Sequence, residues 1–197
     1  MAEAHEQMEH AEHAEHASHS NKGIALLISV LVLFLALAET MGKSAQTNAI
    51  SENIASSDLW AFFQAKSMRV AILHTAAEAL ALEASNESNA AIKAAKEKQI
   101  EDWKKTAARY ESEPETNEGR KELAARAKEA EERRELAMAR YHHFEVAGAA
   151  FEIGIVLASA TIITGMAILA WIAGGLGLIG IAFMAIALLA PHSVHLF

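Results

Sequence analysis

The sequence contains no cysteine and only two prolines among its 197 residues. Without cysteine, the chain can form no disulfide, no thiolate metal site and no cysteine nucleophile. It also lacks the glycine-rich phosphate loops, nucleophile motifs and zinc-protease motifs of common enzyme classes. The net charge is −8, whereas a surface that binds phosphate groups needs clustered positive charge. These features argue against an enzyme and against a nucleic-acid partner.

Lysine and arginine are absent from the C-terminal part of the chain, which contains a long apolar stretch. Within residues 146–190 the only ionisable side chain is that of Glu152, and about 45 residues suffice for two membrane spans. Gly165 is the expected turn, because it leaves two arms that each cross about 30 Å of hydrocarbon. We therefore predict a transmembrane hairpin at residues 144–190 and a C-terminal tail at residues 191–197.

Another apolar stretch lies between Lys22 and Lys43. Residues 23–42 are long enough to cross about 30 Å as a helix, and Glu39 could pair with Lys43 one turn further on. We therefore predict a first transmembrane helix at residues 23–42. A cleaved signal peptide is the alternative, but no basic region precedes the stretch and no convincing cleavage site follows it.

The first 22 residues form a low-complexity tail rich in His, Glu and Ala. This tail has almost nothing to bury, so we predict a flexible, solvated segment for residues 1–22. Histidines three residues apart spiral around a helix, and an adjacent pair offers two ligands where structural zinc needs four. We expect no cofactor other than weakly bound Zn, Ni or Cu ions at these histidines. The histidines concerned are His10, His13, His16 and His19.

Residues 43–143 carry nearly all of the lysine and arginine, which indicates a charged module outside the bilayer. Apolar residues in this module recur at alternating spacings of three and four, which predicts helical seams. The first seam comprises Leu59, Phe63, Val70, Leu73, Ala77, Leu80 and Ala84, with Lys66 out of pattern. The second comprises Ile100, Trp103, Ala107 and Tyr110. The third comprises Leu123, Ala127, Ala130, Ala137, Tyr141 and Phe144, with Arg134 out of pattern.

The lengths of these segments predict how they assemble. Poor helix formers at residues 85–89 predict a turn, and Pro114 predicts an interruption of the returning arm. The outgoing helix would be roughly 63 Å long and the two returning pieces together roughly 72 Å. We therefore predict an all-α membrane protein with three transmembrane helices and a long antiparallel, coiled-coil-like hairpin between the first two. The aromatic residues expected in its interaction seam are Trp60, Phe63, Trp103 and Tyr141.

Glu145 and Glu152 are seven residues apart and would share one face of the second span. An ionisable group inside a span is rare and usually functional. The function that it most directly indicates is a path for protons or cations. The structural alternative places Glu145 at the interface and keeps Glu152 neutral or hydrogen-bonded to another helix. His142 and His143 could bind metal or sense pH, although interfacial histidines usually do neither.

Small residues in the C-terminal stretch recur at spacings that favour close helix contacts. They are Ala150, Gly154, Ala158, Gly174, Gly175, Gly177 and Gly180.

Residues 58–67 (Asp-Leu-Trp-Ala-Phe-Phe-Gln-Ala-Lys-Ser), with residues 141–145 and 155–159, resemble a family of bacterial three-span membrane proteins known only as a domain of unknown function. The resemblance covers nearly the whole chain. It implies the same order of His-rich tail, one span, charged helical region and terminal membrane hairpin, without a known activity. Many members of that family have a basic turn between the last two spans, whereas residues 162–171 here contain no lysine or arginine.

Three spans place the charged hairpin and the C-terminal tail on one side of the membrane. More basic residues flank the spans on the hairpin side than on the other side, which slightly favours a cytoplasmic hairpin. The basic turn typical of the family argues for the opposite orientation. A loop of about 100 residues also exceeds the length for which the charge rule is dependable.

Together these patterns predict a multi-pass structural or interaction protein of the bacterial inner membrane. Its expected partners are the lipid bilayer and either copies of itself or a larger membrane complex. The first alternative is proton or cation transport through an oligomeric bundle that uses Glu152. The second alternative is transition-metal binding by the His-rich tail.

Overall fold

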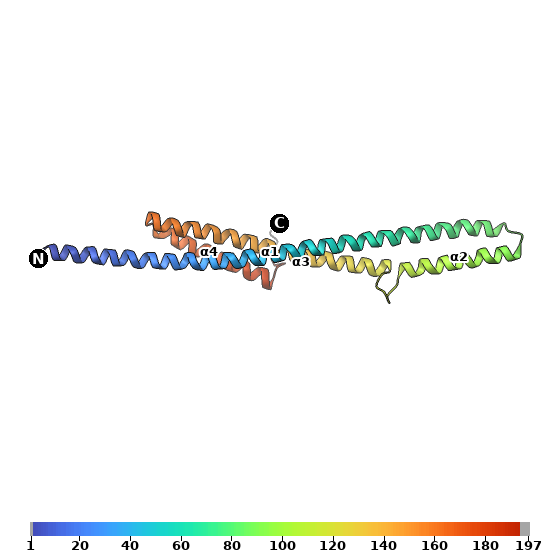
Figure 1. Ribbon diagram of the computed structural model, residues 1–197, viewed down its shortest axis with the longest axis horizontal. Coiled ribbons are helices and arrows are strands. Elements are labelled where there is room, and N and C mark those ends of the chain that lie inside the picture. The colour runs from blue at the N-terminus through green and yellow to red at the C-terminus, as the bar shows by residue number, and fades with distance from the viewer. Residues whose placement is uncertain (1, 194–197) are drawn as a thin grey trace. The chain divides into compact units, whose positions relative to one another are not determined.

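In the computed structural model, residues 2–193 are described, with side chains from residue 22 onward (Figure 1). This part of the chain forms helices and no strand. The helices are α1 (Ala2–Ser85), α2 (Ala90–Glu111), α3 (Arg120–Thr164) and α4 (Ala167–Leu189). Three of them, α1, α3 and α4, are long and apolar enough to cross a membrane. The predicted fold class is confirmed.

The chain divides into two compact units. Met1–Asn48 and Leu136–Phe197 form the first, here called the membrane unit, and Ala49–Glu135 form the second, the hairpin unit. By their bounds, α1 and α3 each contribute to both units, whereas α2 belongs to the hairpin unit and α4 to the membrane unit.

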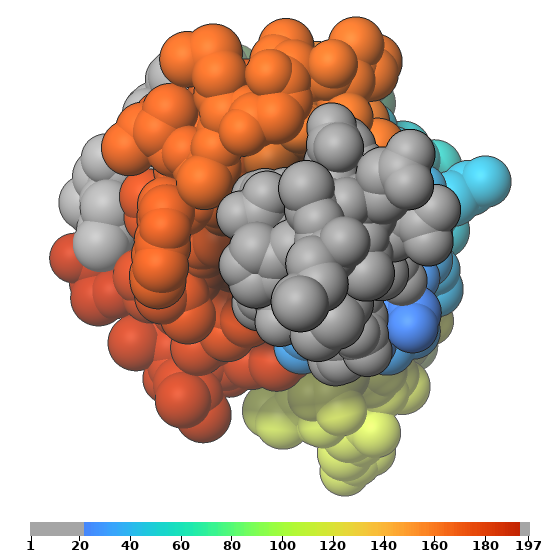
Figure 2. Space-filling view, turned by 90° about the vertical axis from the view of Figure 1, so that its left-hand side faces the viewer, coloured from blue at the N-terminus to red at the C-terminus, as the bar shows by residue number. Residues whose placement is uncertain are grey.

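The membrane unit is a packed arrangement of α1, α3 and α4. Figures 1 and 2 both show α3 (orange) and α4 (red) side by side in this unit. On α1, Leu31 and Ala38 are seven residues apart and buried, which keeps one face of that helix on its neighbours. The ring of Phe34 stacks on that of Phe151, with centroids 5.8 Å apart. The core residues are Leu31, Ala38, Ala45, Phe144, Ala147, Phe151, Met184 and Ala187.

Glycines determine the turn and the closest contacts of the membrane unit. α3 ends at Thr164 and α4 begins at Ala167, with Gly165 between them at a φ of +70°, so the predicted turn is confirmed. A Cβ added at Gly177 would lie 2.7 Å from Leu31, and one at Gly180 would lie 2.6 Å from Phe151. These glycines therefore allow the close helix contacts that were predicted.

Two other glycines of the predicted set make no close helix contact within the described chain. A Cβ added at Gly174 or Gly175 would meet nothing within 4 Å, so neither glycine is needed for a helix contact within the described chain. Gly175 is two residues from Gly177 and so lies on a different face of α4.

The hairpin unit consists of antiparallel helices. Lys96 of α2 lies 3.5 Å from Glu83 and 3.6 Å from Glu87, next to the turn, while Trp60 lies further down α1 and donates to Glu131 of α3. α1 ends at Ser85, and the side chain of Asn89 caps α2 by accepting from two backbone N–H groups. The turn predicted at residues 85–89 is confirmed.

The interruption predicted at Pro114 is also confirmed, because α2 ends at Glu111 and α3 begins at Arg120. Glu122 holds the intervening loop: it accepts a hydrogen bond from the Ser112 hydroxyl at 2.7 Å and from the Glu113 N–H at 3.1 Å. These bonds stabilise the charged carboxylate, and the Ser112 bond is the main reason that the pKa of Glu122 is lowered.

We predict that Gly180→Ala destabilises the membrane unit by about 1–3 kcal/mol, because the new methyl group would overpack the site. The ring it meets belongs to Phe151, which is fully buried and cannot move aside freely. Gly174→Ala is the matched control, since that position is open. Thermal unfolding of both variants in mild detergent, followed by circular dichroism, checks the difference. Equal midpoints for the two variants would contradict the packing described for α3 and α4.

Candidate functional site

The predicted seams are present in the hairpin unit. On α1 the seam residues are either buried, as Val70, Ala77 and Ala84 are, or half-buried. On α2, Ile100 and Ala107 are buried. On α3 the buried seam residues of this unit are Leu123, Ala127 and Ala130.

The aromatic residues of the predicted interaction seam are largely used within their own unit. The Trp60 Nε1–H donates to Glu131 at 2.8 Å, and its ring meets that of Phe63 edge to face at 5.4 Å. Trp103 of α2 is half-buried in the same unit. Tyr141 lies in the membrane unit, where its hydroxyl is 3.4 Å from Glu145. These side chains therefore contribute to intramolecular packing, and whether they also take part in an intermolecular contact stays a prediction.

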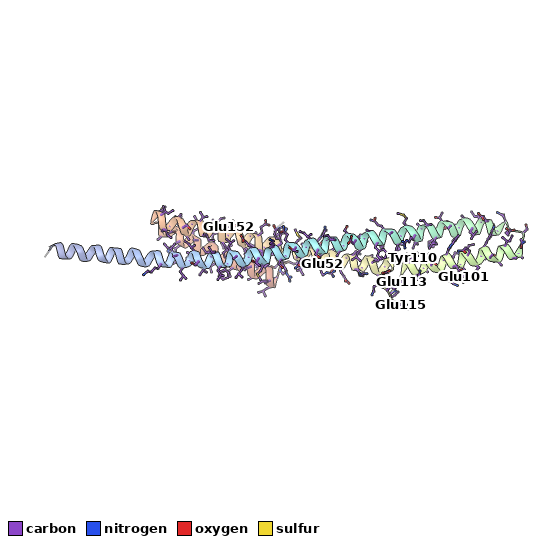
Figure 3. The ribbon with its side chains drawn as sticks, viewed as in Figure 1. Glu52, Glu101, Tyr110, Glu113, Glu115 and Glu152 are labelled. Carbon is purple, nitrogen blue, oxygen red and sulfur yellow. The ribbon has the colours of Figure 1, made fainter. Side chains whose placement is uncertain are left out.

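Lys66, which did not fit the predicted seam, lies inside it and is only 4% exposed. Its ammonium group is 3.4 Å from Glu113, in the loop between α2 and α3. It also lies over two rings, at 5.3 Å from the centre of Phe62 and 5.4 Å from that of Tyr110. Figure 3 shows Glu113 and Tyr110 on the returning arm. No sequence pattern indicates this pairing, because Lys66 and Glu113 are 47 residues apart.

A groove of about 440 Å³ runs between α1 and α3 in the membrane unit. It is called the polar groove here because six charged or polar side chains line it, although most of its lining surface is apolar. α3 contributes Glu145 and Glu152 to it, and Figure 3 shows Glu152 on this helix. The charged and polar side chains that line it are Glu39, Lys43, Gln46, Tyr141, Glu145 and Glu152.

The structure brings the two predicted intramembrane carboxylates to this one groove. Glu152 is exposed, and no hydrogen bond or ion pair of its side chain occurs within residues 22–193. Glu145 is 3.5 Å from Nδ1 of His142. Among the same residues, the pair expected between Glu39 and Lys43 does not form, although both line the groove. The arrangement can receive a cation or a proton, and it can equally face lipid head groups.

His143 belongs to the interior of the membrane unit. It is 1% exposed, and its Nε2 lies 3.0 Å from the carbonyl oxygen of Pro191. Its ring faces that of Phe183 on α4, with centroids 6.0 Å apart. This environment joins α3 to the segment that follows α4, and it leaves the imidazole out of reach of a soluble ligand.

The described residues contain no group of three His, Cys, Asp or Glu side chains that could hold a metal ion. The side chains of the four tail histidines lie outside the part that the structure describes. Weak metal binding at His10, His13, His16 and His19 therefore stays a prediction.

The model of a protein family described as a domain of unknown function, DUF4337, matches residues 20–190. The chain belongs to this family. Membership in DUF4337 confirms the resemblance seen in the sequence, and the match includes the hairpin unit, the polar groove and all three apolar stretches. It begins after His19, so the tail histidines lie outside the DUF4337 match. No curated protein and no solved structure matches the chain.

We predict that Glu113→Ala destabilises the hairpin unit more than Lys66→Met does. Removing Glu113 leaves a buried ammonium group without its carboxylate, at a cost of about 1–3 kcal/mol. Methionine instead places an apolar chain in the seam, and Glu113 keeps Arg109 at 3.8 Å, so the expected loss is below about 1 kcal/mol. Denaturant unfolding of the full chain in detergent, monitored by tryptophan fluorescence, measures both losses. A larger loss for Lys66→Met would contradict the buried ion pair.

Proposed function

We propose that this chain is an interaction protein of the bacterial inner membrane that associates with copies of itself. In this proposal α1, α3 and α4 hold the chain in the bilayer, and the hairpin unit makes the contacts outside it. The observation that carries the proposal is the outer face of α1 in the hairpin unit. Large apolar side chains are exposed there: Met68 is 66% exposed, Ile72 60% and Leu82 71%. Large apolar faces outside a bilayer mark interaction sites.

The charge distribution in the hairpin unit supports this proposal. Within residues 59–82 of α1 the exposed charged side chains are Arg69 and Glu78, because Lys66 is buried. α2 carries ten charged side chains, six basic and four acidic, in 22 residues. The returning arm therefore has a charged outer surface that favours contact with water, whereas α1 exposes an apolar face to it.

We predict that the purified chain is a dimer or larger in mild detergent. Multi-angle light scattering with the detergent mass subtracted measures this over a wide range of protein concentration. Cross-linking in intact membranes before extraction checks that detergent does not create the association. A monomer at every concentration, with no cross-linked species, would refute self-association.

A second candidate function is proton or cation transport, which the exposure of Glu152 on the polar groove favours. Glu39, Glu145 and Lys43 line the same groove, so a cation there would meet three carboxylates and one ammonium group. Transport would require the groove to open into a continuous path in an oligomer.

Substitution of Glu152 separates the two candidate functions. We predict that Glu152→Gln inserts and assembles like the unchanged chain, because glutamine is similar to a neutral glutamic acid in size and hydrogen bonding. Glu152→Lys should insert poorly, since a charged residue near the middle of a span costs about 2.5–3.5 kcal/mol on insertion scales. Membrane yield and oligomer size measure both effects. Normal assembly of Glu152→Gln with loss of ion flux in liposomes would favour transport over the interaction role.

A further inference from the structure

The outer face of α1 in the hairpin unit carries a second heptad stripe, separate from the seam that packs on α2 and α3. Its members follow one another at strictly alternating spacings of four and three residues, and all are exposed. They are Ala61, Ala65, Met68, Ile72, Thr75, Ala79 and Leu82. This spacing is that of a coiled-coil seam, and it continues for three heptads, or about 32 Å of helix. The partner that fits such a stripe is another helix.

The middle of this outer stripe is hollowed. A shallow groove of about 450 Å³ lies against Met68, Ile72 and Ala79, and its walls are almost entirely apolar. In a coiled coil each seam side chain enters a hole formed by four residues of the facing helix. Small residues on both sides of Met68 and Ile72 leave room for such packing.

We propose that the outer stripe of α1 binds the same stripe of a second copy, with the two helices parallel. This inference rests on the proposed self-association and names the surface that mediates it. A two-fold axis places one patch against itself, so the patch must be self-complementary. The stripe itself contains no charged residue, so its own members bring no like charges together when it faces itself; the charged side chains Arg69 and Glu78 lie beside it on α1. Glu83, which flanks its end, is already paired with Lys96 at 3.5 Å.

The other outer faces of the hairpin unit fit this stripe poorly. α2 has ten charged residues in 22, and the first 16 residues of α3 carry eleven, six basic and five acidic. Packing either face on the outer stripe would remove charged groups from water without providing partners. Among the helices of the hairpin unit, α1 is therefore the one whose outer face matches the stripe.

The membrane determines the direction of the pairing. α1 also contains the first apolar stretch, so two copies inserted in one bilayer with the same orientation have α1 running in the same direction. A parallel pair then needs no shift along the axis, and Met68 and Ile72 each face their own counterparts. Register follows from the two-fold symmetry of the parallel pair.

Engineered cysteines test the proposal directly, because the chain has no cysteine of its own. Ala65→Cys lies on the stripe and Ala94→Cys is an exposed control on α2. In a parallel pair the two sulfurs introduced at residue 65 come within disulfide reach, which requires Cα atoms about 4.4–6.8 Å apart. After mild oxidation of intact membranes, we expect a disulfide-linked dimer for Ala65→Cys and a monomer band for Ala94→Cys.

A charge substitution provides the second arm of the experiment. Ile72→Glu places a carboxylate in the stripe, and Ile92→Glu is the matched control, the same change at an exposed isoleucine on α2. We expect Ile72→Glu to weaken association at least about tenfold and Ile92→Glu to leave it unchanged. Circular dichroism of both variants checks that the helices still form.

Three outcomes are distinguishable. Cross-linking at residue 65 together with weakened association of Ile72→Glu supports the stripe. An oligomer that persists in Ile72→Glu and does not cross-link through residue 65 overturns the stripe but leaves self-association through another surface. A chain that is monomeric without any substitution overturns both the stripe and the proposed function.

Discussion

In each unit, packing depends on a stripe of buried α1 residues that recurs every seven residues. In the membrane unit it includes Leu31, Ala38 and Ala45, and in the hairpin unit it includes Val70, Ala77 and Ala84. Within each unit, a period of 3.5 residues per turn keeps these side chains on one face of the helix, whereas in a straight helix of 3.6 residues per turn they would drift away from it. The same residue spacing thus serves two environments. In water the stripe is held by the hydrophobic effect, whereas in a bilayer close packing must supply the attraction.

Three ionisable side chains of these helices are accommodated in three different ways. Lys66 is neutralised by Glu113 and covered by two aromatic rings. His143 is held by the Pro191 carbonyl at 3.0 Å. Within the described residues Glu152 has neither kind of partner and opens onto a groove instead. The contacts of Lys66 and His143 explain how these two side chains are accommodated. An unpaired ionisable group inside a span is costly, so the presence of Glu152 calls for a functional explanation.

The family to which the chain belongs carries no assigned activity, so its surfaces are the source of functional hypotheses. Two surfaces differ from the rest of the described chain. The outer stripe of α1 is apolar where the returning arm is charged, and the polar groove contains charged side chains where the neighbouring spans are apolar. The first suggests a protein partner and the second suggests a cation or a lipid head group. The stripe lies in the hairpin unit and the groove lies in the membrane unit, so the two surfaces can have separate functions.

Local sequence patterns were sufficient to predict the helices from residue 23 onward, the three apolar stretches and the turns at residues 85–89, Pro114 and Gly165. Helix periodicity, capping residues and helix breakers act over a few neighbours, so these features can be recognised without knowing the fold. The contacts of Lys66 with Glu113 and of His143 with the Pro191 carbonyl became visible only in the folded chain. Each of them joins residues nearly 50 positions apart, 47 and 48 respectively. Their pairing depends on the register between helices, which local patterns constrain only to within a turn.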